Sequence, residues 1–160
     1  MTLIDMMVTT AIMAIIAATV IPVTSSNART ITLAATRQLI ADIQYAQLRS
    51  ITQPSNPTRV VIAQGGGSYW LAEADTPNTP IALPEGAVGA GDPYKVVFGG
   101  YRGVNLDGVT VAFTNKEYSV LVFDEYGRLT SAGNVPLRVA FGSSEINLSV
   151  NALTGTITTE

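Results

Sequence analysis

The first 23 residues, Met1-Thr-Leu-Ile-Asp-Met-Met-Val-Thr-Thr-Ala-Ile-Met-Ala-Ile-Ile-Ala-Ala-Thr-Val-Ile-Pro-Val23, decide how the rest of the chain must be organised. Between Asp5 and Arg29 there is no charged side chain, and most residues are apolar. A helix of that length covers about 30 Å, the hydrocarbon thickness of a bilayer. The sequence therefore predicts an N-terminal helix that can span a membrane and that faces lipid or other helices.

The charges around this helix indicate that it is retained. A removable signal peptide needs a basic segment before its apolar residues and a small-x-small cleavage site after them. This chain has Asp5 before them and Thr24-Ser25-Ser26 after them. A carboxylate at the edge of an apolar segment is costly unless it stays at the interface or meets a cation. The nearest cation is the terminal amine, of the same chain or of a neighbouring copy.

The helical pattern continues to about Gln53 and becomes amphipathic. Two prolines, Pro54 and Pro57, then end the helix. We expect a helix over residues 1–53, with residues 1–24 as its apolar half and residues 25–53 packed on a head. Core positions repeat three or four residues apart at Ala35, Leu39, Ile43, Ala46 and Ser50, whereas Arg29, Arg37, Asp42, Gln44, Gln47 and Arg49 are placed on other faces.

Pro22 lies in the middle of the predicted helix. Proline removes one backbone hydrogen bond and clashes with the preceding turn, at about 3 kcal/mol in an ordinary helix. We therefore expect a kink or a short melted segment at this position.

The head, residues 54–160, has the period of two that is typical of strands. Residues 59–64 and 68–73 flank three glycines and predict a β-hairpin. Residues 75–92 carry three prolines and three glycines and predict a long irregular loop, with at most a short strand at 81–83. An α+β fold results, a long helix followed by about seven or eight antiparallel strands. The other strands are expected at 94–98, 109–113, 118–123, 136–141 and 146–150, with a final edge strand after a turn at 152–155.

Composition argues against catalysis and against nucleic acid as a partner. The chain has no Cys and no His, so it offers no disulfide, thiolate or imidazole, and we expect neither an enzyme nor a cofactor. Net charge is −3 and only 13% of residues are charged, which disfavours a nucleic-acid surface. The head carboxylates are scattered, so no metal site is predicted.

Two head segments are candidates for other roles. The loop from Asp75 to Asp92 is long enough to form a surface recognition loop, as in a membrane-anchored binding module. Asn147-Leu-Ser149 matches the N-glycosylation sequence, so Asn147 is a candidate attachment site.

The run Thr2-Leu-Ile-Asp-Met-Met-Val8, followed by Ala/Ile-rich sequence and Pro22, resembles the mature N-terminus of type IV pilins and type II secretion pseudopilins. Met1 stands where this family usually has Phe, and Asp5 where it usually has Glu. The head segment Phe123-Asp-Glu-Tyr-Gly-Arg128 and the closing Leu153–Ile157 resemble H-type minor pseudopilins and related fimbrial pilins.

The resemblance implies the pilin fold and a role in a filament. A prepilin peptidase would cut a leader before residue 1, and the new terminus, Met1, would be N-methylated. The subunit would wait in the inner membrane and then enter a homopolymeric helical filament through the pilus or secretion machinery. Asp5 would neutralise the amine of a neighbouring Met1. The filament is extracellular for a pilus and periplasmic for a pseudopilin, and abundant pilin, minor pseudopilin and membrane-anchored binding module stay open as alternatives.

Overall fold

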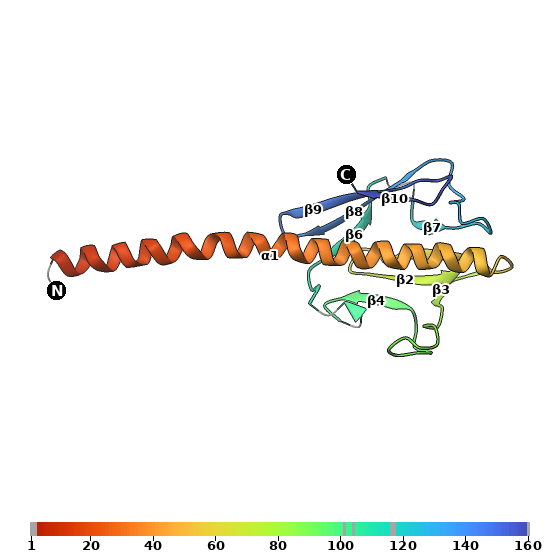
Figure 1. Ribbon diagram of the computed structural model, residues 1–160, viewed down its shortest axis with the longest axis horizontal. Helices are drawn as coiled ribbons and strands as arrows, with labels where there is room; N and C mark the ends of the chain where they lie inside the picture. The colour runs from red at the N-terminus through yellow and green to blue at the C-terminus, as the bar shows by residue number, and fades with distance from the viewer. Residues whose placement is uncertain (1–2, 101, 104, 116–117, 160) are drawn as a thin grey trace.

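In the computed structural model one long helix runs through a β-rich head and projects beyond it (Figure 1). The structure describes residues 3–100, 102–103, 105–115 and 118–159, without the side chains of residues 3 and 14–26. Helix α1 spans Leu3–Thr52, or 50 residues. The last hydrogen bond of this helix is donated by the Gln53 backbone amide to the Arg49 carbonyl at 2.8 Å. The prolines that follow prevent the helix from continuing. The predicted helix length is confirmed.

Helix α1 is continuous across Pro22, so the melted segment predicted there is absent from the described backbone. Among the described residues, no helical stretch combines the length and the hydropathy needed to cross a bilayer. The span predicted over residues 1–24 falls mostly on residues 1–3 and 14–24, whose side chains lie outside the described set.

The first sheet of the head has the order β5-β4-β2-β1-β7, with β3 paired to β2. The predicted hairpin is confirmed, because β1 and β2 pair antiparallel with Val60 opposite Leu71. The strands of this sheet are β1 (Thr58–Ile62), β2 (Ser68–Glu73), β3 (Thr76–Pro80), β4 (Lys95–Phe98), β5 (Arg102–Gly103) and β7 (Val120–Val122).

The second sheet is antiparallel throughout, in the order β10-β9-β8-β6. Its longest pairing joins β8 and β9 over seven residue pairs. The final edge strand predicted at the C-terminus is β10. The strands are β6 (Thr110–Phe113), β8 (Val135–Phe141), β9 (Ser144–Val150) and β10 (Ile157–Thr159).

The second half of α1 contacts strands of both sheets, β1 in one and β8 and β9 in the other. The predicted stripe from Ala35 to Ser50 is confirmed, because all five of its members are fully buried. Apolar side chains at alternate strand positions meet this stripe and form one core. They include Val60, Tyr69, Leu71, Leu121, Leu137 and Leu148.

Two strands were not expected. β3 lies inside the segment predicted as an irregular loop, and it tolerates Pro77 and Pro80 because it is an edge strand. β5 has only two residues and pairs parallel to β4. The described residues thus form ten strands rather than seven or eight, and one pair departs from the antiparallel pattern.

Candidate functional site: the long helix and its junction with the head

The N-terminal part of α1 projects beyond the head (Figure 1). The side chains described there, at residues 4–13, are exposed. Thr9 and Thr10 donate their hydroxyls to the carbonyls of Asp5 and Met6, at 2.8 and 2.9 Å. The hydroxyls of both threonines therefore have hydrogen-bond partners within the helix and do not need water. An exposed apolar surface of this kind marks contact with protein or membrane. Its large side chains, 51% to 73% exposed, are Ile4, Met6, Met7, Val8, Ile12 and Met13.

Asp5 lies in the first turn of α1, where the partial positive charge of the helix N-terminus favours a carboxylate. Its side chain is exposed. Met1 lies outside the described residues, so its pairing with Asp5 of another copy stays a prediction. Only the helical backbone of Pro22, the third predicted assembly residue, is described.

A buried polar cluster joins the second half of α1 to the first sheet. The Asp42 carboxylate accepts hydrogen bonds from the hydroxyls of Tyr69 at 2.6 Å and Tyr94 at 2.8 Å. All three residues are buried. Hydrogen bonds from hydroxyls to an ionised acceptor are short and strong, so the cluster fixes α1 against β2 and the start of β4.

Burial is the largest influence on the Asp42 carboxyl and raises its pKa. The donors Tyr69 and Tyr94 and the nearby Arg102 act in the opposite direction without cancelling it. Burial and the Asp42 charge raise the pKa of both tyrosines, so both hydroxyls stay protonated as donors.

Arg102 packs against Tyr94 at the edge of this cluster. Its guanidinium stacks over the Tyr94 ring at 4.3 Å, and that ring stacks on Tyr45 with centroids 5.3 Å apart. The Gln38 amide donates to the Arg102 carbonyl at 2.8 Å. Arg102 adopts φ +61°, a conformation uncommon for a residue with a side chain. Cation–π stacking and the Gln38 bond hold it there.

The placement of Asp42 corrects the sequence analysis, which put this residue on a polar face. Asp42 is only 5% exposed and lies beside Ile43 on the head side of α1. The spacing of Asp42 in the sequence did indicate burial, because it lies three residues after Leu39 and four before Ala46, and both of these are predicted core positions. Its hydroxyl partners are 27 and 52 residues away, so no local pattern reveals them.

A second junction lies near the end of α1. The Gln47 amide donates to the carbonyls of Gly127 and Thr154, at 2.8 and 3.0 Å, and so binds two turns of the head to the helix. Gly127 has φ +75°, and a Cβ there would lie 2.8 Å from Ile51 Cδ1. Glycine at this position therefore lets the turn approach the helix closely.

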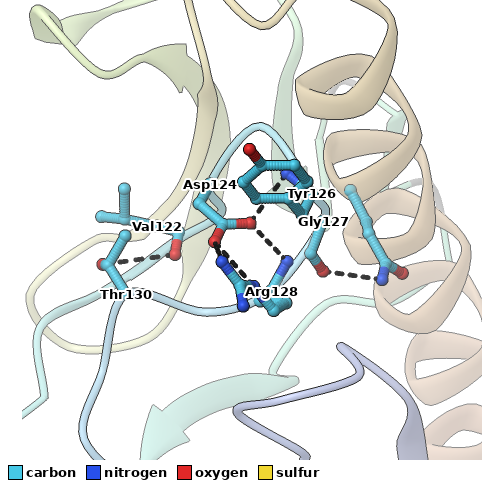
Figure 2. A network of polar contacts seen from close by, with 7 residues as sticks. Val122, Asp124, Tyr126, Gly127, Arg128 and Thr130 are labelled. Carbon is cyan, nitrogen blue, oxygen red and sulfur yellow. Dashed lines mark hydrogen bonds and ion pairs between the residues drawn. The ribbon is translucent and has the colours of Figure 1, made fainter.

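Figure 2 shows how Asp124 shapes the first of these turns. Its carboxylate accepts from the backbone amides of Tyr126 and Arg128, at 2.9 and 2.8 Å, and pairs with the Arg128 guanidinium at 2.9 Å. Slight burial acts to raise the pKa of Asp124, but these donors outweigh it and lower the pKa. The Asp124 carboxylate therefore stabilises the turn over residues 124–127.

The other candidate residues lie apart from these junctions. Asp75 and Asp92 are exposed at the two ends of the segment that contains β3. Asn147 is exposed on β9, opposite Arg138 of β8. In the part of the chain that the structure describes, no group of three or more acidic residues is positioned to hold a metal ion.

Comparison with known proteins gives the fold its name. No family model and no curated protein matches the sequence. Two crystal structures of the type IV minor pilin FimU from Pseudomonas aeruginosa match the structure at 18% identity. The first has a TM-score of 0.56 and covers 82% of this chain and 90% of FimU. The second has a TM-score of 0.53, with coverages of 80% and 91%. The chain has the pilin fold.

Proposed function

We propose that this chain is a structural, non-catalytic subunit of a type IV pilus-like filament. One observation carries the proposal, a continuous 50-residue helix whose second half is buried in the head while residues 4–13 expose large apolar side chains. A helix of this kind needs either lipid or other helices around its free half. The pilin fold, which the chain shares with FimU, is consistent with a helix that is surrounded first by lipid and then, after assembly, by other helices.

Within the filament, Asp5 neutralises the methylated amine of a neighbouring Met1. The amine and the carboxylate are the charges at the start of an otherwise apolar helix, and each is costly to bury alone. Their pairing sets the axial position of an incoming subunit. Before assembly the helix lies in the inner membrane, after a prepilin peptidase has removed a leader, and the assembled filament lies outside the cell.

A minor subunit is the second candidate, because the matching solved structures are of a minor pilin. A minor pseudopilin of a type II secretion system belongs to the same class. Subunit stoichiometry separates the two candidates, since an abundant pilin dominates purified filaments and a minor subunit is present at a small fraction.

The test is Asp5→Ala in cells that assemble the filament. Removing one partner of a buried ion pair costs about 3 to 5 kcal/mol, so we expect a stable membrane-inserted subunit that does not polymerise. Asp5→Glu keeps the charge and should assemble, and Glu145→Ala removes an exposed head carboxylate as a matched control. Negative-stain microscopy of sheared material measures yield, and mass spectrometry tests for methylated Met1. Normal filament yield from Asp5→Ala would exclude the pairing mechanism.

A further inference from the structure

A shallow hollow lies between the connection that follows α1 and the turn at residues 124–128. Its volume is about 410 Å³. Pro54, Pro57 and Val122 supply apolar surface to its lining, and the side chains of the turn supply polar and charged groups. A concave site that combines apolar surface with a few polar groups is the general form of a site for a small molecule.

Tyr126 gives the hollow an aromatic surface. The residue is 68% exposed, although its ring is large and apolar. The Arg128 guanidinium lies over this ring, 4.9 Å from its centroid (Figure 2). A hydrogen bond to the Glu125 carboxylate raises the pKa of the Tyr126 hydroxyl. Both contacts restrain the ring while most of the residue stays open to solvent.

The turn that carries Tyr126 is ordered by its own side chains. The Asp124 carboxylate accepts hydrogen bonds from the Tyr126 and Arg128 amides, at 2.9 and 2.8 Å. The same carboxylate pairs with the Arg128 guanidinium at 2.9 Å. A site that is already ordered loses less conformational entropy when a ligand binds, so more of the contact energy contributes to affinity.

The backbone beside the hollow is paired within the head. The Phe123 amide donates to the Thr58 carbonyl at 3.2 Å, and the Thr130 amide donates to the Val122 carbonyl at 3.0 Å. An extended peptide that adds to a sheet edge binds chiefly through main-chain hydrogen bonds. Because these groups are already bonded, recognition in the hollow depends on side chains rather than on strand addition.

Charge narrows the class of ligand. Asp124 and Arg128 form an ion pair, so their charges largely balance each other. The exposed Glu125 carboxylate repels an anion, and the Arg128 side chain, which is 49% exposed, repels a cation. A carboxylate has several acceptor sites, so the bond from Tyr126 leaves Glu125 able to accept others. The lining therefore favours a neutral ligand with hydroxyl groups.

We propose that this hollow binds a neutral hexopyranose residue. One face of such a sugar consists of C–H groups, which pack on the Tyr126 ring, and its edge carries hydroxyls, which bond to Glu125 and Arg128. The site is independent of filament assembly. Residues 4–13, the exposed apolar segment of α1, lie at the other end of the helix from the hollow.

Saturation-transfer NMR on the full chain tests this site, in a detergent without a sugar headgroup that would compete. The probes are the methyl pyranosides of glucose, galactose, mannose and N-acetylglucosamine. We expect at least one of them to bind with a Kd on the order of 1 mM, as befits a ligand of this size. The analogue of a bound sugar with a carboxylate at C6 should bind about threefold more weakly, because it meets Glu125.

Two substitutions separate the aromatic contact from the charge. Tyr126→Ala should weaken binding about tenfold, whereas Val88→Ala, which removes a fully exposed apolar side chain outside the hollow, should not change it. Glu125→Gln should keep an amide oxygen as an acceptor and abolish the discrimination against the carboxylate analogue. Urea unfolding followed by Trp70 fluorescence checks that each variant is folded.

Binding of none of the four probes would overturn the proposal, and so would unchanged binding to a folded Tyr126→Ala variant. Tighter binding of the carboxylate analogue would overturn the assignment of a neutral ligand. If Tyr126→Ala does not fold, Glu125→Gln decides, because persistent discrimination in that variant would place the sugar elsewhere. These measurements need no filament, so their failure leaves the proposed function intact.

Discussion

Replacing Asp42 by alanine removes the acceptor shared by two buried tyrosine hydroxyls, at 2.6 and 2.8 Å. Each hydrogen bond to a charged group contributes about 1.5 to 3 kcal/mol, so losing both costs about 3 to 6 kcal/mol. Relief of the buried charge offsets part of this cost. We expect Asp42→Ala to lower the free energy of unfolding by about 2 to 4 kcal/mol at neutral pH, a large fraction of the 5 to 15 kcal/mol typical of a domain.

The pH dependence of this loss has a definite sign. Burial raises the pKa of Asp42 in the folded chain above its usual value, so the folded state holds the proton more tightly than the unfolded state. The stability that this protonation contributes is fully present below the unfolded pKa and is lost as pH rises through the folded pKa. Asp42→Ala should therefore cost more near about pH 4 than near about pH 7.

Urea unfolding of the full chain in mild detergent measures both effects. The sole tryptophan, Trp70, follows Tyr69 in β2 and reports on this part of the head. Asp75→Ala removes an exposed carboxylate and should change stability by less than about 0.5 kcal/mol, which makes it the matched control. A loss below about 0.5 kcal/mol from Asp42→Ala, or a loss that grows with rising pH, would refute the reasoning.

Three further substitutions test the junctions by the same assay. Gly127→Ala should destabilise by about 1 to 3 kcal/mol more than Gly86→Ala, because both have positive φ but only the first meets a helix side chain; equal losses would contradict this. Tyr94→Phe should lower the free energy of unfolding by about 1 to 3 kcal/mol and raise the pKa of Asp42 further, because it removes one hydrogen bond to the carboxylate. The pH range over which stability changes should then extend to higher pH, and an unchanged range would argue against the Tyr94–Asp42 hydrogen bond. Glu73→Gln breaks a partly exposed pair with Arg49 at 3.0 Å, and a loss above about 1 kcal/mol would be unexpected.

Local patterns in the sequence were sufficient for most of the fold. The apolar N-terminal run, the stripe from Ala35 to Ser50 and the prolines after Gln53 predicted α1 closely. Three glycines between alternating strands predicted the hairpin of β1 and β2. In these cases the deciding interactions lie within a few residues of one another, so period and turn chemistry determine the structure.

Non-local contacts account for what the sequence analysis missed. β3 contains two prolines and is a strand only because β2 offers it an edge. β5 exists because its two residues meet β4 in parallel register. The Asp42 cluster depends on hydroxyls that arrive from β2 and from the start of β4, and a charged residue in an amphipathic helix is ordinarily assigned to the solvent.

The two junctions lie on the head side of α1 and leave its opposite face exposed. Asp42 and Gln47 hold the head, whereas Arg37 and Ala41 face away from it. In the proposed filament the head is fixed to the helix that packs, so the register of that helix would also set the position of the head. Loosening the Asp42 cluster should therefore disturb the order of the heads in the proposed filament before it disturbs the packing of the helices.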